Sequence, residues 1–151
     1  MTARSRLNCA DAFEARSARP LHVVLGVVAQ PASPAYPALQ TARTGGSPRL
    51  FAKTGLFAKP GARFTVSVPA PLKHKLNIGW GNPAASLSQE VVVPACRGTA
   101  HDWPSFPGEY WVDHPACVAV IVRAGFRSRS VHVGLGTPCP GQRPPQGPSQ
   151  S

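Results

Sequence analysis

Residues 96–117 hold the densest group of side chains in this sequence that could do chemistry. Two cysteines and two histidines in this stretch, Cys96, His101, His114 and Cys117, are of the types that bind zinc. Structural zinc sites usually bring their ligands in tight pairs, but Cys96 and His101 are five residues apart with a glycine between them. We therefore expect a disulfide and solvated histidines, and no metal or other cofactor. A Cys/His metal-binding module is an alternative.

The same stretch also contains the side chains that could act in general acid–base catalysis. Glu90 is the only carboxylate of residues 48–139 outside it. No pair in the stretch has the defined separation across a substrate that paired carboxylates need. The chain also lacks a Gly-x-Ser-x-Gly elbow, a phosphate loop and a dinucleotide-binding motif. A non-enzymatic protein is therefore favoured, and a loop-based hydrolase using His101 or His114 is the alternative.

Three cysteines are expected at the ends of predicted strands. Cys96 follows one strand, Cys117 opens the next and Cys139 follows the last. If these strands run antiparallel in sequence order, the three thiols reach the same end of the sheet. A disulfide there would stabilise the domain by about 2 to 4 kcal/mol and would indicate an oxidising compartment. Cys96–Cys117 is the first pairing expected and Cys96–Cys139 the second, although connectivity does not follow from sequence. The remaining thiol is free or pairs with Cys9.

Aromatic residues are concentrated between Cys96 and Cys117. Nine residues contain four of the eleven aromatics of the chain. Such a cluster either caps an open end of the fold as core or forms a recognition surface for sugar, peptide or another chain. On the second interpretation the binding candidates, with one neighbouring cation, are Arg97, Trp103, Phe106, Tyr110 and Trp111.

The formal charge of +10 predicts attraction to anionic surfaces or polymers. The cations are spread along the chain, and no run of consecutive Lys or Arg occurs. A nucleic-acid-binding protein would more often concentrate its cations on one element with aromatics interleaved, so nucleic acid is not expected. An anionic cell-envelope polymer or another protein is the expected partner.

Period-two alternation of apolar and polar residues predicts a succession of short strands. Residues 97–116 are expected to form a long loop rich in glycine and proline. The sequence LFAK occurs twice, six residues apart, which is too short a spacing for a solenoid repeat. This pattern favours an all-β fold, a small antiparallel β-sandwich or partly open barrel. The predicted strands are residues 62–68, 74–80, 87–93, 117–123 and 127–135.

The expected domain of residues 48–139 is flanked by segments of different composition. Residues 1–29 combine a weak helix with nine mostly apolar residues, too few to span a bilayer. That apolar run suits a secretory signal, and a buried strand or a mis-assigned start are the other interpretations. Residues 30–47 and 140–151 are rich in proline, glycine and small polar residues, so we expect a linker and a disordered tail.

Four motifs carry a resemblance to a known group of proteins: GWGNPA at 79–84, VVVPAC at 91–96, FPGEYWVDHPACVAVIVRAG at 106–125 and VGLGTPCPG at 133–141. Residues 50–141 resemble small uncharacterised actinomycete proteins, many of them exported. The resemblance implies no catalytic or binding residue. Together with the charge and the aromatics it favours a secreted or cell-envelope, non-enzymatic binding or structural domain.

Overall fold

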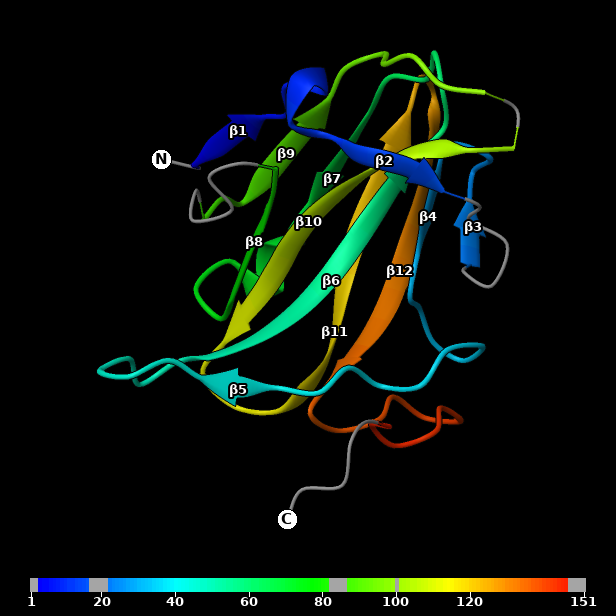
Figure 1. Cartoon of the computed structure of the whole chain (residues 1–151). Coiled ribbons are helices and arrows are strands. Elements are labelled where there is room, and N and C mark those ends of the chain that lie inside the picture. The colour runs from blue at the N-terminus through cyan, green and yellow to red at the C-terminus, as the bar shows by residue number, and fades with distance from the viewer. Residues whose placement is uncertain (1–2, 17–21, 82–86, 100, 147–151) are drawn as a thin grey trace.

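The computed structural model describes residues 3–16, 22–81, 87–99 and 101–146. Within these ranges the regular elements are strands and two short 3-10 turns, Cys9–Asp11 and Ala70–Leu72, and none is an α-helix. The strands form two sheets that pack face to face without closing into a barrel (Figure 1). The expected all-β sandwich is therefore confirmed.

The first sheet has five strands. Its order is β1 (Arg4–Arg6), β9 (Glu90–Val93), β7 (Phe64–Ser67), β11 (Ala116–Ala124) and β12 (Arg127–Leu135). The pairing of β1 with β9 is parallel, whereas the other neighbours are antiparallel. We call this layer the five-stranded sheet.

The second sheet has seven strands built around a long central pair. Its main path runs β2 (Phe13–Arg16), β10 (Trp103–Val112), β6 (Leu50–Ala58), β4 (Val28–Gln30) and β3 (His22–Val24). In addition β5 (Ala42–Arg43) pairs with β6, and β8 (Leu76–Trp80) pairs with β10. Strands β6 and β10 pair over eight residues, from Ser105 opposite Phe57 to Val112 opposite Leu50. We call this layer the seven-stranded sheet.

Alternation along the strands builds the core between the two sheets. Strand β6 shows how, because its two LFAK copies lie six residues apart, an even number that returns each residue type to the same side of the strand. Both leucines and both alanines of the repeat are buried, while Phe51, Lys53 and Phe57 lie on the outer face. In the five-stranded sheet, β11 and β12 contribute a similar inward row of five valines and a leucine, Val118, Val120, Val122, Val131, Val133 and Leu135.

All five predicted strands are present, as β7, β8, β9, β11 and β12. The long loop expected after residue 96 is different, because most of it is β10. Pro104, Pro107 and Gly108 made this stretch read as a loop. Pro107 is tolerated because its carbonyl accepts a hydrogen bond from Gly81 N (2.8 Å), so its nitrogen faces the same edge. On that edge, Pro107 lies between the residues paired with β2 and those paired with β8. The N–H that proline lacks would therefore have no carbonyl of a paired strand to bond there.

The extra strand also changes which cysteines can pair in disulfides. With β10 inserted, β9 and β11 run in the same direction, since both are antiparallel to β7. The end of β9 and the start of β11 therefore lie at opposite ends of the sheet. The expected Cys96–Cys117 and Cys96–Cys139 pairings are wrong. The structure has Cys9–Cys96 and Cys117–Cys139 instead, and each disulfide fastens a different end of the sandwich.

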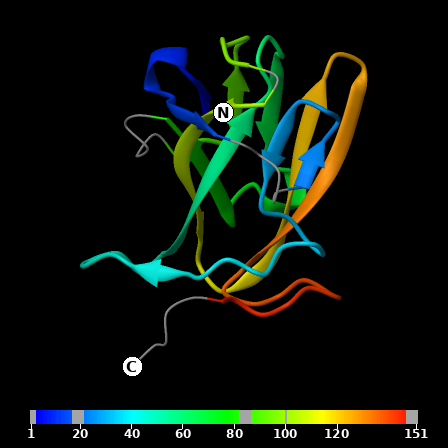
Figure 2. The same cartoon turned by 45° about the vertical axis from the view of Figure 1, so that its right-hand side comes forward.

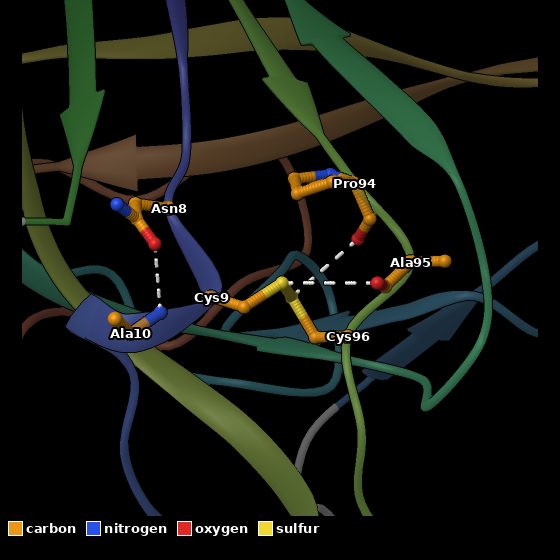
Figure 3. The surroundings of a disulfide bond; sticks show 6 residues. All are labelled: Asn8, Cys9, Ala10, Pro94, Ala95 and Cys96. Carbon is orange, nitrogen blue, oxygen red and sulfur yellow. Dashed lines mark hydrogen bonds between the residues drawn. A yellow bond between two sulfur atoms is a disulfide. The ribbon is translucent and has the colours of Figure 1, made fainter.

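The Cys9–Cys96 bond joins the N-terminal segment to the loop after β9 (Figure 3). The Asn8 side chain accepts a hydrogen bond from Ala10 N (2.9 Å) and so caps the turn that carries Cys9. The carbonyl oxygens of Ala95 and Pro94 lie 3.7 and 3.6 Å from the two sulfurs. Because a disulfide sulfur carries no proton, these are packing contacts and not hydrogen bonds.

The segments expected to flank the domain are part of it. Val24, Val28 and Ala29 are fully buried in β3 and β4, as the buried-strand interpretation of this apolar run expects. Residues 30–47, expected as a linker, pack on the sandwich: Ala32 and Ala38 are buried, and β5 pairs with β6. Small alanine side chains let a proline-rich segment lie close to the strands.

The start of the expected tail is also ordered. The buried side chain of Gln142 accepts a hydrogen bond from Cys139 N (2.9 Å) and donates one to Tyr36 O (2.6 Å). In addition, Ala38 N donates to Arg143 O (3.0 Å). Residues 147–151 lie outside the described residues. Among the described residues, no helix has both the length and the hydropathy that a membrane crossing requires.

Candidate functional site

The outer face of the seven-stranded sheet carries a row of facing side chains along β6 and β10. Register sets Trp111 opposite Phe51, Glu109 opposite Lys53, Pro107 opposite Gly55 and Ser105 opposite Phe57. These residues alternate with the buried ones on both strands, so all of them project away from the core. Side chains held on two paired central strands are fixed more rigidly than side chains on loops.

A groove of about 780 Å³ crosses this face. It exists because Gly55 has no side chain and faces the low ring of Pro107, which leaves a hollow between bulkier neighbours. Phe13 on β2 and Phe57 on β6 stand on one side of the hollow, and Lys53 stands on the other. Phe13 is 66 % exposed. We call this hollow the aromatic groove. It is lined by Phe13, Lys53, Thr54, Gly55, Phe57, Ser105, Phe106, Pro107 and Gly108.

A second hollow continues from the groove toward the Cys9–Cys96 disulfide. Phe13 lines both hollows, and the second one also includes Arg97, Pro104 and residues on either side of the disulfide. Arg97 is exposed in the loop between β9 and β10. A polymer crossing the groove would therefore pass from Lys53, over two phenylalanines, to a second cation at Arg97.

The other end of the face is braced by contacts within the protein. The rings of Phe51 and Trp111 lie 5.3 Å apart between centroids with an interplanar angle of 35°. Beside them the Arg49 guanidinium donates to Asp113 Oδ1 (3.0 Å), Asn77 Oδ1 (2.8 Å) and Trp111 O (3.1 Å). These bonds tie β8 to the end of β10. This end is a structural support, and the open part of the face is the aromatic groove.

The five binding candidates from the sequence are not all on one surface. Phe106 and Tyr110 point into the core with exposed fractions of 0 % and 1 %, which is the core interpretation of the aromatic cluster. Trp103 and Trp111 lie half-buried on the outer face, and Arg97 lies in the loop before β10. The structure therefore divides the predicted cluster between the core and the candidate surface.

Tyr110 forms a polar contact inside the core. Its ring meets Trp80 edge-on with centroids 5.5 Å apart, and its hydroxyl donates to Gln30 Oε1 at 3.4 Å. Burial raises the pKa of the Tyr110 hydroxyl well above its usual range, because the phenolate would be desolvated. Tyr110 is therefore a neutral core residue.

The structure does not bring together the residues of the alternative metal site, nor the two histidines of the alternative hydrolase. Cys96 and Cys117 are each bonded to another cysteine, so neither has a thiolate to offer a metal. His101 precedes β10 and His114 follows it, and a strand of ten residues separates them by roughly 30 Å. The described part of the chain contains no cluster of three His, Cys, Asp or Glu side chains able to hold a metal ion. The two histidines therefore do not lie in one site.

Of the residues that line the groove, only Phe106 was predicted from the sequence, and those not predicted include Phe13, Lys53, Gly55 and Phe57. The available signal was the even spacing of the LFAK repeat, which places both of its phenylalanines on one side of any strand that contains it. Comparisons with models of protein families, with curated proteins and with solved structures find no match to this chain. The functional interpretation of the aromatic groove therefore rests on the geometry of the groove.

Proposed function

We propose that the protein is an exported or envelope-associated, non-enzymatic domain that binds an anionic polysaccharide in the aromatic groove. One observation carries the proposal: an open hollow on rigid strands has the exposed ring of Phe13 and the half-buried ring of Phe57 at its wall, and cations at both ends. Contiguous apolar surface that is exposed and rimmed by polar residues is typical of interaction sites.

A sugar chain fits this combination of groups. The face of a pyranose ring presents weakly positive C–H groups, which pack on the negative face of an aromatic ring. Sugar hydroxyls meet polar groups such as Ser105 and Thr54, which line the same hollow. The groove is open along the sheet, so it suits a chain that passes through better than a small ligand that must be enclosed.

The charges near the groove favour an anionic chain. Lys53 and Arg97 are both exposed, and the nearest carboxylate in the register is Glu109, directly across from Lys53. Glu109 offsets part of the Lys53 charge, but it is not among the lining residues. The chain as a whole carries +10, so its long-range field also attracts a polyanion.

The cysteines support the proposed location outside the cytoplasm. All four cysteines form disulfides, which suits an oxidising environment. An extracellular or cell-envelope site is where a structural polysaccharide would be met.

The proposal is tested with three soluble polymers and the full-length protein. Polygalacturonate offers rings and carboxylates, dextran offers rings alone, and polyglutamate offers carboxylates alone. We expect polygalacturonate to bind most tightly in isothermal titration calorimetry, and Phe57→Ala to weaken it by about tenfold through loss of one stacking surface. Phe126→Ser is the matched control, because it changes an exposed phenylalanine far from the groove.

Two results would reject the groove as the binding site. One is equal affinity for polyglutamate and polygalacturonate, which would show that charge alone accounts for binding. The other is a Phe57→Ala variant that binds polygalacturonate as well as the unmodified protein does.

A further inference from the structure

The turn between β11 and β12 exposes a phenylalanine completely. Gly125, with φ of 61°, reverses the chain, and Phe126 is 109 % exposed. The neighbouring turn between β3 and β4 lies beside it, because Arg127 Nη2 donates to Leu25 O at 3.0 Å. Figure 2 shows these two hairpin tips, blue and orange, side by side at one corner of the sandwich. A single exposed apolar residue is common on protein surfaces, so the residues around Phe126 must show whether it has a function.

Three arginines surround a shallow hollow that reaches this tip. The hollow lies on the outer face of the five-stranded sheet and is lined by Arg6, Arg63 and Arg123, with Thr65 at its floor and Gly125 at its edge. We call it the arginine hollow. Gly125 is the residue before Phe126, so the hollow and the exposed ring adjoin each other.

Strand register explains why these arginines converge. One row across four strands reads Arg6 on β1, Val92 on β9, Thr65 on β7 and Arg123 on β11. With strands about 4.8 Å apart, the outer two Cα atoms are roughly 14 Å from each other. That spacing lets both guanidinium groups lean over the short side chains between them toward one bound anion. Arg123 is held in place by donating to Ser67 Oγ at 3.2 Å.

The positive charge of the hollow is not neutralised by its own lining. No residue that lines it is acidic. The nearest carboxylate on this face is Glu90, and that group is paired with Arg4 at 3.0 Å. Arg127 and Arg129 are exposed just past the tip, on the side of β12 that faces the other sheet, and they add to the positive charge of this corner. Guanidinium groups bind phosphate through paired N–H donors, so phosphate is the natural ligand for this hollow.

We propose that this corner of the sandwich docks on an anionic phospholipid surface, with a lipid phosphate in the arginine hollow and Phe126 in the apolar boundary beneath the headgroups. A free phosphate ion would use the arginines but has nothing to offer an exposed phenyl ring. A lipid supplies both the charge and the apolar layer within a few ångströms of each other. The proposal does not depend on the aromatic groove, which lies on the opposite sheet.

The test is sedimentation of the full-length protein with large vesicles of phosphatidylcholine, with and without 30 % phosphatidylglycerol. We expect binding only to the vesicles that contain the anionic lipid, and weaker binding in about 1 M salt. Phe126→Ser should lower the partition coefficient by about tenfold. The double variant Arg63→Gln, Arg123→Gln should lower it at least as much. Phe13→Ser, which changes an exposed phenylalanine of the aromatic groove, should leave it unchanged.

Insertion is measured directly with Phe126→Trp, which keeps an aromatic ring at the tip. Its emission should shift to the blue on vesicle binding and be quenched by lipids brominated in the acyl chain. The proposal is overturned if the protein does not sediment with anionic vesicles, or if the tryptophan at position 126 is not quenched. It is also overturned if Phe126→Ser binds as the unmodified protein does while the arginine variant does not, because the protein would then bind the charged headgroups without insertion of the ring. Since the vesicles contain no polysaccharide, these outcomes leave the proposed polymer binding unaffected.

Discussion

Removing the Cys9–Cys96 disulfide should cost more stability than removing Cys117–Cys139. The first bond joins residues 87 apart in sequence and the second joins residues 22 apart. The chain entropy that a disulfide removes from the unfolded state grows with the logarithm of the number of residues in the closed loop. The resulting stabilisation is about 4 to 5 kcal/mol for the longer loop and about 3 to 4 kcal/mol for the shorter. The variants are Cys9→Ala with Cys96→Ala, and Cys117→Ala with Cys139→Ala.

The longer bond also holds a part of the fold that has few other attachments. Strand β1 is paired with β9 over only three residues, and β2 pairs with only one end of β10. Leu7, which is 4 % exposed, packs in the core between these two strands. Without the disulfide this segment should open before the rest of the sandwich, which adds a local loss to the global one.

Guanidinium denaturation followed by tryptophan fluorescence measures both variants against the unmodified protein. Hydrogen exchange of the β1 and β9 amides reports the local opening. The reasoning is refuted if the Cys117, Cys139 variant is the less stable of the two, or if the Cys9, Cys96 variant loses under about 1 kcal/mol and keeps its amide protection.

Three further substitutions test other parts of the structure. Gly108→Ala should unfold the protein at room temperature or cost more than about 3 kcal/mol, because the new Cβ would lie 2.1 Å from Gly79 O and 2.3 Å from the Trp80 ring; circular dichroism checks this. Gly55→Val should keep the melting temperature within about 5 °C, since its Cβ meets only a Phe57 ring carbon at 3.8 Å, yet it should weaken polygalacturonate binding in calorimetry by filling the groove. Tyr110 stays protonated when buried while the unfolded chain ionises near pH 10, so stability should fall as pH rises above about 10. Tyr110→Phe should flatten that decline in urea titrations from pH 9 to 11.

The strands with clean alternation could be predicted from the sequence, because one face of each is buried and the other is not. Strand β12 was predicted with its bounds, since its inward positions are Val131, Val133 and Leu135 and glycine turns adjoin it on both sides. Strand β6 lacks clean alternation because its LFAK repeat places apolar residues on both faces, so only the even six-residue spacing indicates a strand. Strand β10 is hidden in the sequence by its two prolines. Pro107 lies in the gap between the residues paired with β2 and those paired with β8, and Pro104 lies at the register shift between Trp103 and Ser105.

The candidate site depended on the element that was missed. Trp103 and Trp111 could be selected as surface residues from their type, but separating them from Phe106 and Tyr110 required knowing that all four lie on one strand. Phe13 is distant in sequence and reaches the groove only through the pairing of β2 with β10. The predicted disulfide pairings were wrong for the same reason, because one additional strand reverses the direction of the chain between Cys96 and Cys117.

Amide chemical-shift mapping tests the polysaccharide site most directly. The full-length protein, labelled with nitrogen-15, is titrated with a short polygalacturonate oligomer while its amide shifts are followed. We expect the largest changes at Gly55, Phe57 and Ser105 on the two central strands, with the amides of the five-stranded sheet unmoved. Changes centred on Arg6, Arg123 and the β11–β12 turn, or no changes at all, would contradict the assignment of the groove.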